Sequence, residues 1–325
     1  MPQISTSYAC GRIGVLKRNA LHRAQLERLQ SAPSFEEASR VLADIGFTTA
    51  DNQDFQAAAD QHVRKACELI EAVTPDARIT DCFLLRYDVH NLKVLLKSRQ
   101  LAQKPEFLSA CGTVPVEKLR HAVAEHLYNG LPAELKQAMN RLEKQIATRY
   151  DPSRVDTELD RAMYRQVFQN LRESKLPLAL LYFKAKVDLQ NFIILMRARN
   201  MGRDAAFFES VALPGGDVPI ATYRKAFEDN DRLVKLLKLY GVPVYQAALS
   251  AAINPKKLPQ MEKFADDYLY QLFKPYRYDS ASMEMLIAYL FQKQREATDV
   301  RLIMAGKLNG FTPDAVEERV RALNG

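Results

Sequence analysis

The sequence predicts an all-α protein, and three observations lead to this fold class. Only 12 of the 325 residues are glycine, whereas Leu, Ala, Lys, Arg and Glu, which favour helices, are abundant. Apolar residues recur at helical spacing along most of the chain, and strand-like alternation is nearly absent. Helix start and stop signals divide the chain into segments of ordinary helix length. With 47% hydrophobic residues the chain can bury a large core, and its length allows two or three domains.

Helix boundaries follow from local signals, and roughly ten to twelve helices are expected between them. Ser34 followed by Glu37 is a capping-box pattern, and Gly46 ends the helix that it starts. Asn254-Pro255 and Thr312-Pro313 each place a capping side chain before a proline at the first helical position. Residues 215–223 are the best candidate for a short extended piece. Breaks are expected at residues 74–77, 129–132, 151–153, 213–219, 241–243 and 274–280.

One helix is written more than once along the chain. YDVHNLKVLLKSR at residues 87–99 is echoed by VDLQNFIILMRAR at residues 187–199, so that Asp88 and Asn91 return as Asp188 and Asn191. A weaker third copy at residues 295–310 carries Glu296 and Asp299 in the same places, and a faint fourth at residues 8–19 lacks the polar pair. Each copy leads into another helix ending near glycine, at residues 37–47, 117–130, 229–241 and 315–325. These repeats predict a helical unit that is used three or more times.

The repeated polar pair borders an apolar helix face, and two interpretations are open. Positions 88, 92, 95 and 99 share one face of a helix, and position 91 neighbours both 88 and 95. The pair could form a polar site inside a helical bundle. It could instead hydrogen-bond to backbone or polar groups of an adjacent helix and fix its register. Because a packing contact is copied whenever its unit is duplicated, recurrence favours a structural motif made of Asp88, Asn91, Asp188, Asn191, Glu296 and Asp299.

Basic residues close the same helix in each copy, and they too have two interpretations. They could simply interact favourably with the negative end of the helix dipole. Alternatively, pseudo-symmetric units could bring these helix ends onto one basic rim that faces an acidic partner. The residues concerned are Lys97, Arg99, Arg197, Arg199 and Lys307.

No catalytic, metal or cofactor site is predicted. The stretch AGKLNG at residues 305–310 has Leu after Gly-Lys and no preceding strand, so it is not a phosphate-binding loop. PGGD at residues 214–217 is interpreted as a turn. His121 and His126 are five positions apart, which places them on different sides of a helix and not in line for a metal. The four cysteines form no C-x-x-C pair and are expected to be reduced residues that fill the core.

Composition favours a soluble protein kept in the cytoplasm. No apolar run approaches the roughly 20 residues that cross a bilayer, and no secretion signal is visible at the N-terminus. The net charge of +7, from 46 Lys and Arg against 39 Asp and Glu, permits an acidic partner, lipid headgroups or nucleic acid. Because acids and bases are interleaved, the pattern argues against nucleic-acid binding.

The repeated helices resemble those of a known family. RYDVHNLKVLLKSR resembles the D-x-H-N-L-x-x-L-L-(K/R) helix of the C subunit of V/A-type rotary ATPases, whose counterpart in vacuolar enzymes is the d subunit. VDLQNFIILMRAR resembles that family's second D-x-x-N helix, and the stretch from Glu296 to Ile303 resembles its third. SFEEASRVLADIGF is similar to an early helix of the family. The likeness runs from about Tyr8 to Asn324, with a departure at Gly11, where the first copy lacks Asn.

The resemblance implies a fold, partners and a role. It implies a funnel of three similar helical domains around a pseudo-threefold axis, with approximate units at residues 1–85, 86–185 and 186–325. Residues 295–325 are one candidate to pack with the first unit. The family member catalyses nothing and needs no cofactor: it sits on the cytoplasmic face of the membrane rotor ring, receives the tip of the central shaft, and joins ATP turnover to ion movement. Membrane association would come through the ring, since no lipid anchor or basic amphipathic tail is visible.

A second class of function stays open at this point. The chain could be a freestanding α-helical repeat scaffold that binds another protein, or a nucleic acid, through a concave basic face. An enzyme is the third class, and it is disfavoured because no acid–base or metal set assembles in the sequence.

Overall fold

A computed structural model describes residues 4–17, 21–47, 54–172, 174, 176–311 and 316. Within these residues all regular structure is α-helix or 3-10 helix and no strand is present, so the all-α prediction is confirmed. The described residues form fifteen α-helices, more than the ten to twelve expected. The surplus comes from short helices such as α10 (Ala205–Val211), α11 (Ile220–Lys225) and α12 (Asn230–Lys235), which are too brief to show periodicity.

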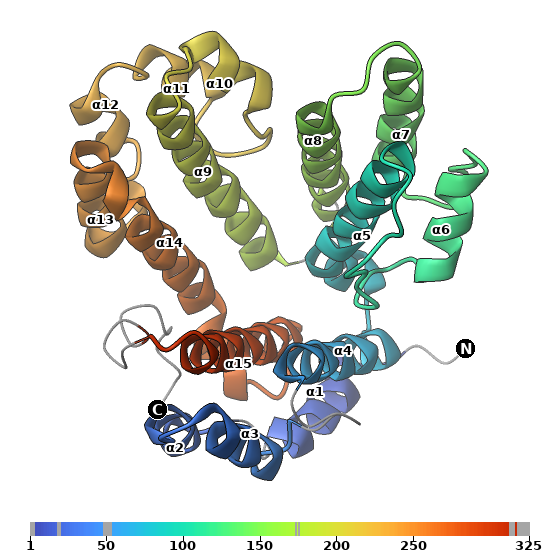
Figure 1. Cartoon of the computed structure of the whole chain (residues 1–325), viewed down its shortest axis with the longest axis vertical. Helices are drawn as coiled ribbons and strands as arrows, with labels where there is room; N and C mark the ends of the chain where they lie inside the picture. Colours follow the sequence, from blue (N-terminus) through green and yellow to red (C-terminus); the bar gives the residue numbers. More distant parts are fainter. Residues whose placement is uncertain are drawn as a thin grey trace. The chain divides into compact units, whose positions relative to one another are not determined.

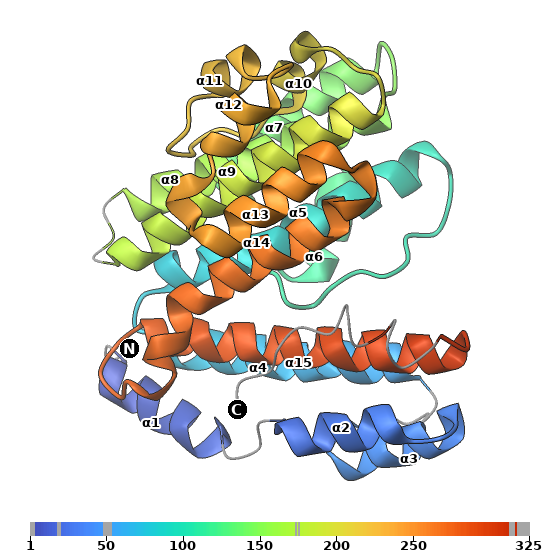
Figure 2. The same cartoon turned by 90° about the vertical axis from the view of Figure 1, so that its left-hand side faces the viewer.

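The chain divides into two compact units, residues 1–77 with 273–325 and residues 78–272. The first unit combines the two ends of the chain. Its centre is the pair α4 (Phe55–Val73) and α15 (Glu284–Leu308), which lie side by side in Figures 1 and 2. Around this pair stand α1 (Thr6–Leu16), α2 (Arg23–Ser31), α3 (Phe35–Asp44) and the 3-10 helix η4 (Lys274–Tyr278). The prediction of three units around a pseudo-threefold axis stays a prediction.

The core of the first unit joins residues far apart in the sequence. Leu29 and Leu42, from α2 and α3, are buried with Val300 and Met304 of α15 in one apolar cluster. Burying such side chains stabilises a fold by roughly 1.5–3 kcal/mol each. The C-terminal helix is therefore an integral part of the unit that the N-terminal helices build.

The second unit contains two long helices of 24 residues, α5 (Ala77–Gln100) and α9 (Pro177–Asn200), which carry the two best copies of the repeat. Each is followed by a loop and shorter helices (Figure 1). After α5 come α6 (Val116–Ala124), α7 (Ala133–Ile146) and α8 (Pro152–Leu171). After α9 come α10, α11, α12, the 3-10 helix η2 (Lys238–Tyr240), α13 (Val242–Ile253), the 3-10 helix η3 (Pro255–Lys257) and α14 (Leu258–Phe273).

Several predicted boundaries are where local signals placed them. Ser34 accepts a hydrogen bond from the backbone N–H of Glu37 at 3.2 Å and begins α3, and Gly46, with φ of +94°, follows its end. Asn254 caps the backbone N–H of Lys256, although what it starts is the 3-10 turn η3 that leads into α14. Two residues of the faint fourth copy, Arg18 and Asn19, lie outside the described residues, and so do Thr312 and Pro313. Of the helix expected at residues 315–325, only Val316 is described.

The expectation of an extended piece at residues 215–223 is wrong. Residues 215–219 are bends and loop, and α11 begins at Ile220. Pro219 occupies the position before the helix, with φ of −59° and ψ of 140°, so the chain turns directly into α11. The alternating polar and apolar residues of this segment belong to a loop whose backbone N–H groups at Asp217 and Val218 bond to Asp188 of α9.

No helix in the described part of the chain is both long and apolar enough to cross a bilayer. All four cysteines, Cys10, Cys67, Cys82 and Cys111, are free and buried.

Candidate functional site

The first copy of the polar pair holds the loop that leads from α5 to α6. Asn91 donates from Nδ2 to the carbonyl oxygen of Ser109 and accepts from the Ser109 N–H, each at 2.8 Å. The carboxylate of Asp88 accepts from the Thr113 N–H at 2.8 Å, the Thr113 hydroxyl at 2.6 Å and the Val114 N–H at 3.1 Å. Asp88 and Asn91 are fully buried. These two side chains and backbone 109–114 are called the first cradle.

The second copy makes the same arrangement with the loop that leads from α10 to α11. Asn191 exchanges two hydrogen bonds with the backbone of Leu213, at 2.9 and 2.8 Å. Asp188 accepts from the backbone N–H groups of Asp217 and Val218, at 2.9 and 3.2 Å. We call these side chains and backbone 213–218 the second cradle. Asp and Asn in both copies therefore bind mainly loop backbone, and a polar group of an adjacent helix, the other expected kind of partner, contributes only in the second copy, through Tyr240 of η2.

Tyrosines add to the second cradle. The hydroxyl of Tyr240 donates to Asp188 Oδ2 at 2.6 Å, and that of Tyr223 donates to the Asp188 carbonyl oxygen at 2.9 Å. Burial raises the pKa of Asp188 above its usual range, while the hydrogen bonds from Tyr240 and from the loop backbone oppose the shift. Burial likewise raises the pKa of Asp88 against the hydrogen bonds from Thr113. Each carboxyl is thus occupied by donors of its own unit and is placed to brace the loop.

A glycine in each cradle allows the close approach. A Cβ added at Gly112 would lie 2.1 Å from Asp88 Oδ1, and one at Gly216 would lie 2.0 Å from Asp188 Oδ1. Each glycine opens a Gly-x-Val-Pro sequence, at residues 112–115 and 216–219, whose proline directly precedes α6 or α11. Sequence reasoning missed this second repeat and took the latter glycine for part of an ordinary turn. The signal that could have found it is the recurrence of Gly-x-Val-Pro about 25 residues after each Asp.

The third copy, in the first unit, is centred on the buried carboxylate of Glu296. Glu296 of α15 accepts from the Leu21 N–H at 3.2 Å, and its other oxygen contacts His62 Nε2 of α4 at 2.7 Å and Lys293 Nζ at 2.9 Å. Burial alone would raise the pKa of Glu296, but His62 and Lys293 outweigh it and hold that pKa below its usual value. Asp299 is fully buried one turn further along α15. Because Glu296 bonds to α4 and to Leu21, it joins three separate segments of its unit.

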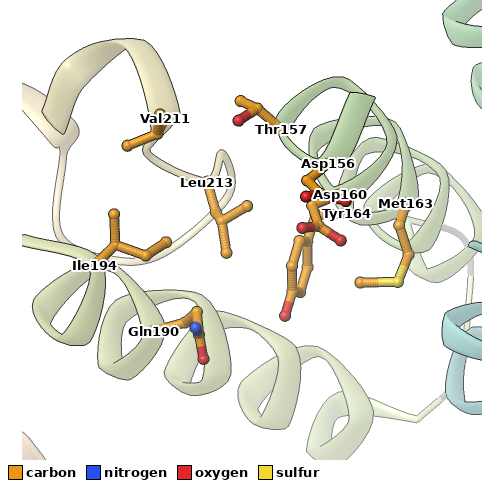
Figure 3. A pocket seen from close by; sticks show the side chains of 9 residues that line it. All are labelled: Asp156, Thr157, Asp160, Met163, Tyr164, Gln190, Ile194, Val211 and Leu213. Atoms are coloured by element: carbon orange, nitrogen blue, oxygen red, sulfur yellow. The ribbon is translucent and has the colours of Figure 1, made fainter. Parts of the chain in front are cut away.

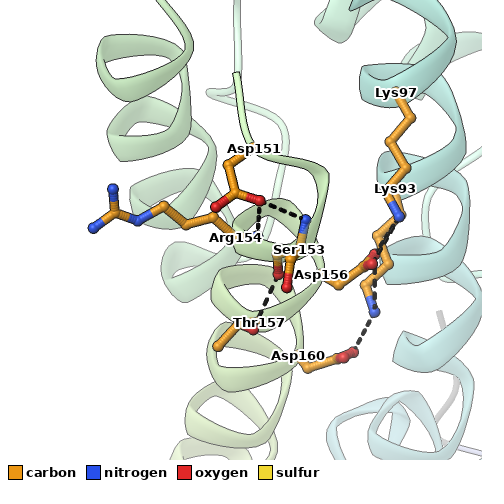
Figure 4. Close-up of polar contacts among 8 residues, drawn as sticks. All are labelled: Lys93, Lys97, Asp151, Ser153, Arg154, Asp156, Thr157 and Asp160. Atoms are coloured by element: carbon orange, nitrogen blue, oxygen red, sulfur yellow. Dashed lines mark hydrogen bonds and ion pairs between the residues drawn. The ribbon is translucent and has the colours of Figure 1, made fainter. Parts of the chain in front are cut away.

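The predicted rim residues all contact groups of their own unit. Figure 4 draws the ion pairs of Lys97 with Asp156, at 2.6 Å, and of Lys93 with Asp160, also at 2.6 Å, which link α5 to α8. Arg99 donates from Nη2 to both carboxylate oxygens of Glu143, each at 2.8 Å, and its side chain is 23% exposed.

The equivalent residues of the later copies differ in exposure. Arg199 donates to Asn230 at 2.7 Å, whereas Arg197, paired with Glu262, is 54% exposed. Lys307 donates to the carbonyl oxygens of Gln30 and Ala32. That these helix ends form one partner-facing rim stays a prediction.

A cavity of about 280 Å³ lies between α8, α9 and the segment after α10 (Figure 3). Its wall is partly polar, from Asp156, Asp160 and Gln190, and partly apolar, from Ile194 and Leu213. Both carboxylates are already engaged by Lys97 and Lys93. Among the described residues no group of His, Cys, Asp and Glu side chains is arranged to hold a metal ion.

Comparisons with known proteins identify what the braced helices belong to. The family model described as ATP synthase (C/AC39) subunit matches residues 9–319. The C subunit of the V-type sodium ATPase of Enterococcus hirae is 24% identical over 83% of this chain and 83% of its own length. The C subunit of the A-type ATP synthase of Thermococcus kodakarensis is 23% identical over 97% of this chain and 90% of its own length. The family match covers both cradles and the ion-paired Glu296 region.

Proposed function

Because the chain belongs to the family of ATP synthase C/AC39 subunits, we propose that it is the non-catalytic central-stalk adaptor of a V/A-type rotary ATPase. In this role it seats the rotor shaft on the membrane ring and transmits torque between ATP turnover and ion transport. It works at the cytoplasmic face of the membrane as a peripheral subunit, held there by the ring. The carrying observation is the family match over residues 9–319, supported by relatives named as an ATP synthase subunit and a sodium ATPase subunit.

The cradles support this role because torque transmission needs stiff connections between helices. In each cradle a fully buried helix carboxylate accepts hydrogen bonds of 2.8–3.2 Å from backbone N–H groups of the segment before α6 or α11. Such bonds are strong in a low-dielectric interior and costly to break. Rotating α6 against α5, or α11 against α9, would therefore strain these hydrogen bonds.

The proposal includes the arrangement expected from the repeats: three similar units around a pseudo-threefold axis, with the basic helix ends on a rim that faces an acidic partner. The rim carries a specific test. Arg197 is the most exposed of the rim residues that form ion pairs. Reversing its charge should weaken partner binding, and the effect should be largest at low salt. Binding that is unchanged by Arg197→Glu at all salt concentrations would count against the rim.

The function itself is tested by purification from native membranes. A tagged chain should co-purify with the ring and shaft subunits from detergent-solubilised membranes. Crosslinking mass spectrometry on that complex should join one surface of the chain to ring loops and another to the shaft. Recovery of the chain alone, from membranes in which the ATPase is otherwise intact, would contradict the proposal.

A further inference from the structure

Helix α13 carries an apolar stripe that its own unit leaves uncovered. Val242 is 65% exposed, Leu249 37% and Ile253 73%, and Leu239, just before the helix, is 58% exposed. At 100° per residue, positions 242, 249 and 253 fall within about 40° of one another on the helix surface. The opposite face, with Val244, Ala247, Ala248 and Ala251, is buried. A helix that is apolar on both faces is usually covered on both.

Lysines precede and follow α13 in the sequence, and none is a residue of the helix itself. Between Leu233 and Met261 the only charged residues are Lys235, Lys238, Lys256 and Lys257. All four are exposed, and within the described part of the chain none of them forms an ion pair. Lys238 lies over the ring of Tyr245, with Nζ 5.5 Å from the ring centroid. The 12-residue backbone of α13, about 18 Å long, lies between the two pairs of lysines in the sequence.

The stripe is held rigidly by other parts of its own unit. Arg199 bonds to Asn230, whose amide donates to the Ala252 carbonyl oxygen near the end of α13 at 3.2 Å. At the other end, Tyr240 next to Leu239 is anchored on Asp188 of the second cradle. Figure 1 draws α13 farther from α5 and α8 than α14. The surface is therefore preorganised, which lowers the entropic cost of binding.

We propose that the α13 stripe docks an apolar helix of another subunit of the same ATPase, one that carries acidic residues at both ends of its contact face. The surface is one helix wide, and its exposed positions follow the spacing of helix-to-helix packing. Gln246, exposed in the middle of the stripe, suits a protein partner because an amide needs hydrogen bonds that lipid chains do not supply. A membrane-surface helix would instead carry its lysines along its flanks. A second copy of this chain is disfavoured because like charges would meet.

The inference rests on the proposed function and is tested inside the purified complex. A photoreactive benzoylphenylalanine replaces Leu249, and a matched control places it at Leu127, which is 60% exposed but lies outside the stripe. After irradiation of the tagged complex, position 249 should yield one dominant adduct with an apolar helical peptide bordered by Asp or Glu, and position 127 should not yield that adduct. A double variant that carries both Lys256→Glu and Lys257→Glu should lower the yield of the position-249 adduct by at least about fivefold. The control variant Lys118→Glu should leave that yield unchanged.

The outcomes separate the two proposals. A complex that contains the chain but gives no adduct from position 249, or only a lipid adduct, a self-adduct or a peptide without acidic residues, overturns the docking surface and leaves the adaptor role standing. A chain that never co-purifies with ATPase subunits overturns both.

Discussion

Replacing Asp188 by Ala tests whether the second cradle holds its loop in place. The change removes the acceptor for one buried donor, the hydroxyl of Tyr240, and for two part-buried donors, the N–H groups of Asp217 and Val218. Leaving the Tyr240 hydroxyl unsatisfied costs about 1–3 kcal/mol, and each part-buried N–H loses a hydrogen bond worth about 0.5–1.5 kcal/mol, so the three donors together cost about 2–6 kcal/mol. Relief from burying a carboxyl offsets part of this cost, so we expect the free energy of unfolding to fall by about 2–4 kcal/mol.

The assay combines urea unfolding, followed by far-UV circular dichroism, with hydrogen exchange of the amides at residues 213–218. The midpoint should fall, and exchange at Asp217 and Val218 should speed up most. Asp188→Asn, which keeps one oxygen, should lie between Ala and the wild type. Glu228→Ala, at an exposed carboxyl of the same unit, is the control and should change little. A loss below about 1 kcal/mol, with exchange of the loop unchanged, would refute the bracing role.

Three further predictions follow from the same contacts. Gly112→Ala should destabilise the protein by several kcal/mol, on the order of an overpacked core, because the new Cβ would meet Asp88. The control Gly14→Ala, in an open position of α1, should be neutral or stabilise by about 0.5–1 kcal/mol. Equal effects of the two changes in thermal melts would contradict this prediction. Burial lowers the pKa of His62 in the folded state, so the unfolded state binds a proton first as the pH falls. The stability contribution is fully present above the unfolded pKa and is lost as the pH drops from about 6.5 towards the folded pKa. His62→Gln should flatten this pH dependence of the melting temperature, and an unchanged dependence would count against the assignment. Arg99→Ala should lower the free energy of unfolding by about 1.5–3 kcal/mol, because the partly buried carboxylate of Glu143 loses both hydrogen bonds from Arg99. Arg197→Ala, at an exposed ion pair, should lower it by less than about 1 kcal/mol. The reverse order in urea unfolding would be evidence against Arg99 as an internal structural contact.

The fold class could be predicted from the sequence because helix signals are local. The start of α3 at Ser34 and its end before Gly46 depend only on a hydroxyl three residues from an N–H and on a glycine that tolerates positive φ. The short helices α10 to α12 escaped prediction because six or seven residues make too few turns to display a period.

The partners of the polar pairs could not be predicted in the same way. Recurrence singled out Asp88 and Asp188, but the bonds they make reach 25 to 30 positions along the chain and depend on how the loop returns to its helix. Glu296 contacts His62 across 234 positions, and no local pattern specifies that contact. The basic residue Arg99 was visible as a helix-end cation, whereas its bond to Glu143 of α7 required the folded unit.

We propose that this chain couples the soluble and membrane parts of a rotary ATPase. ATP-driven ion pumping by membrane vesicles from cells that lack the gene tests this role, measured beside ATP hydrolysis by the same vesicles and by vesicles in which the gene is restored. We predict that pumping is lost without the chain and returns with it, while hydrolysis by the catalytic head does not depend on it. Full coupled pumping in the absence of the chain would contradict the adaptor role.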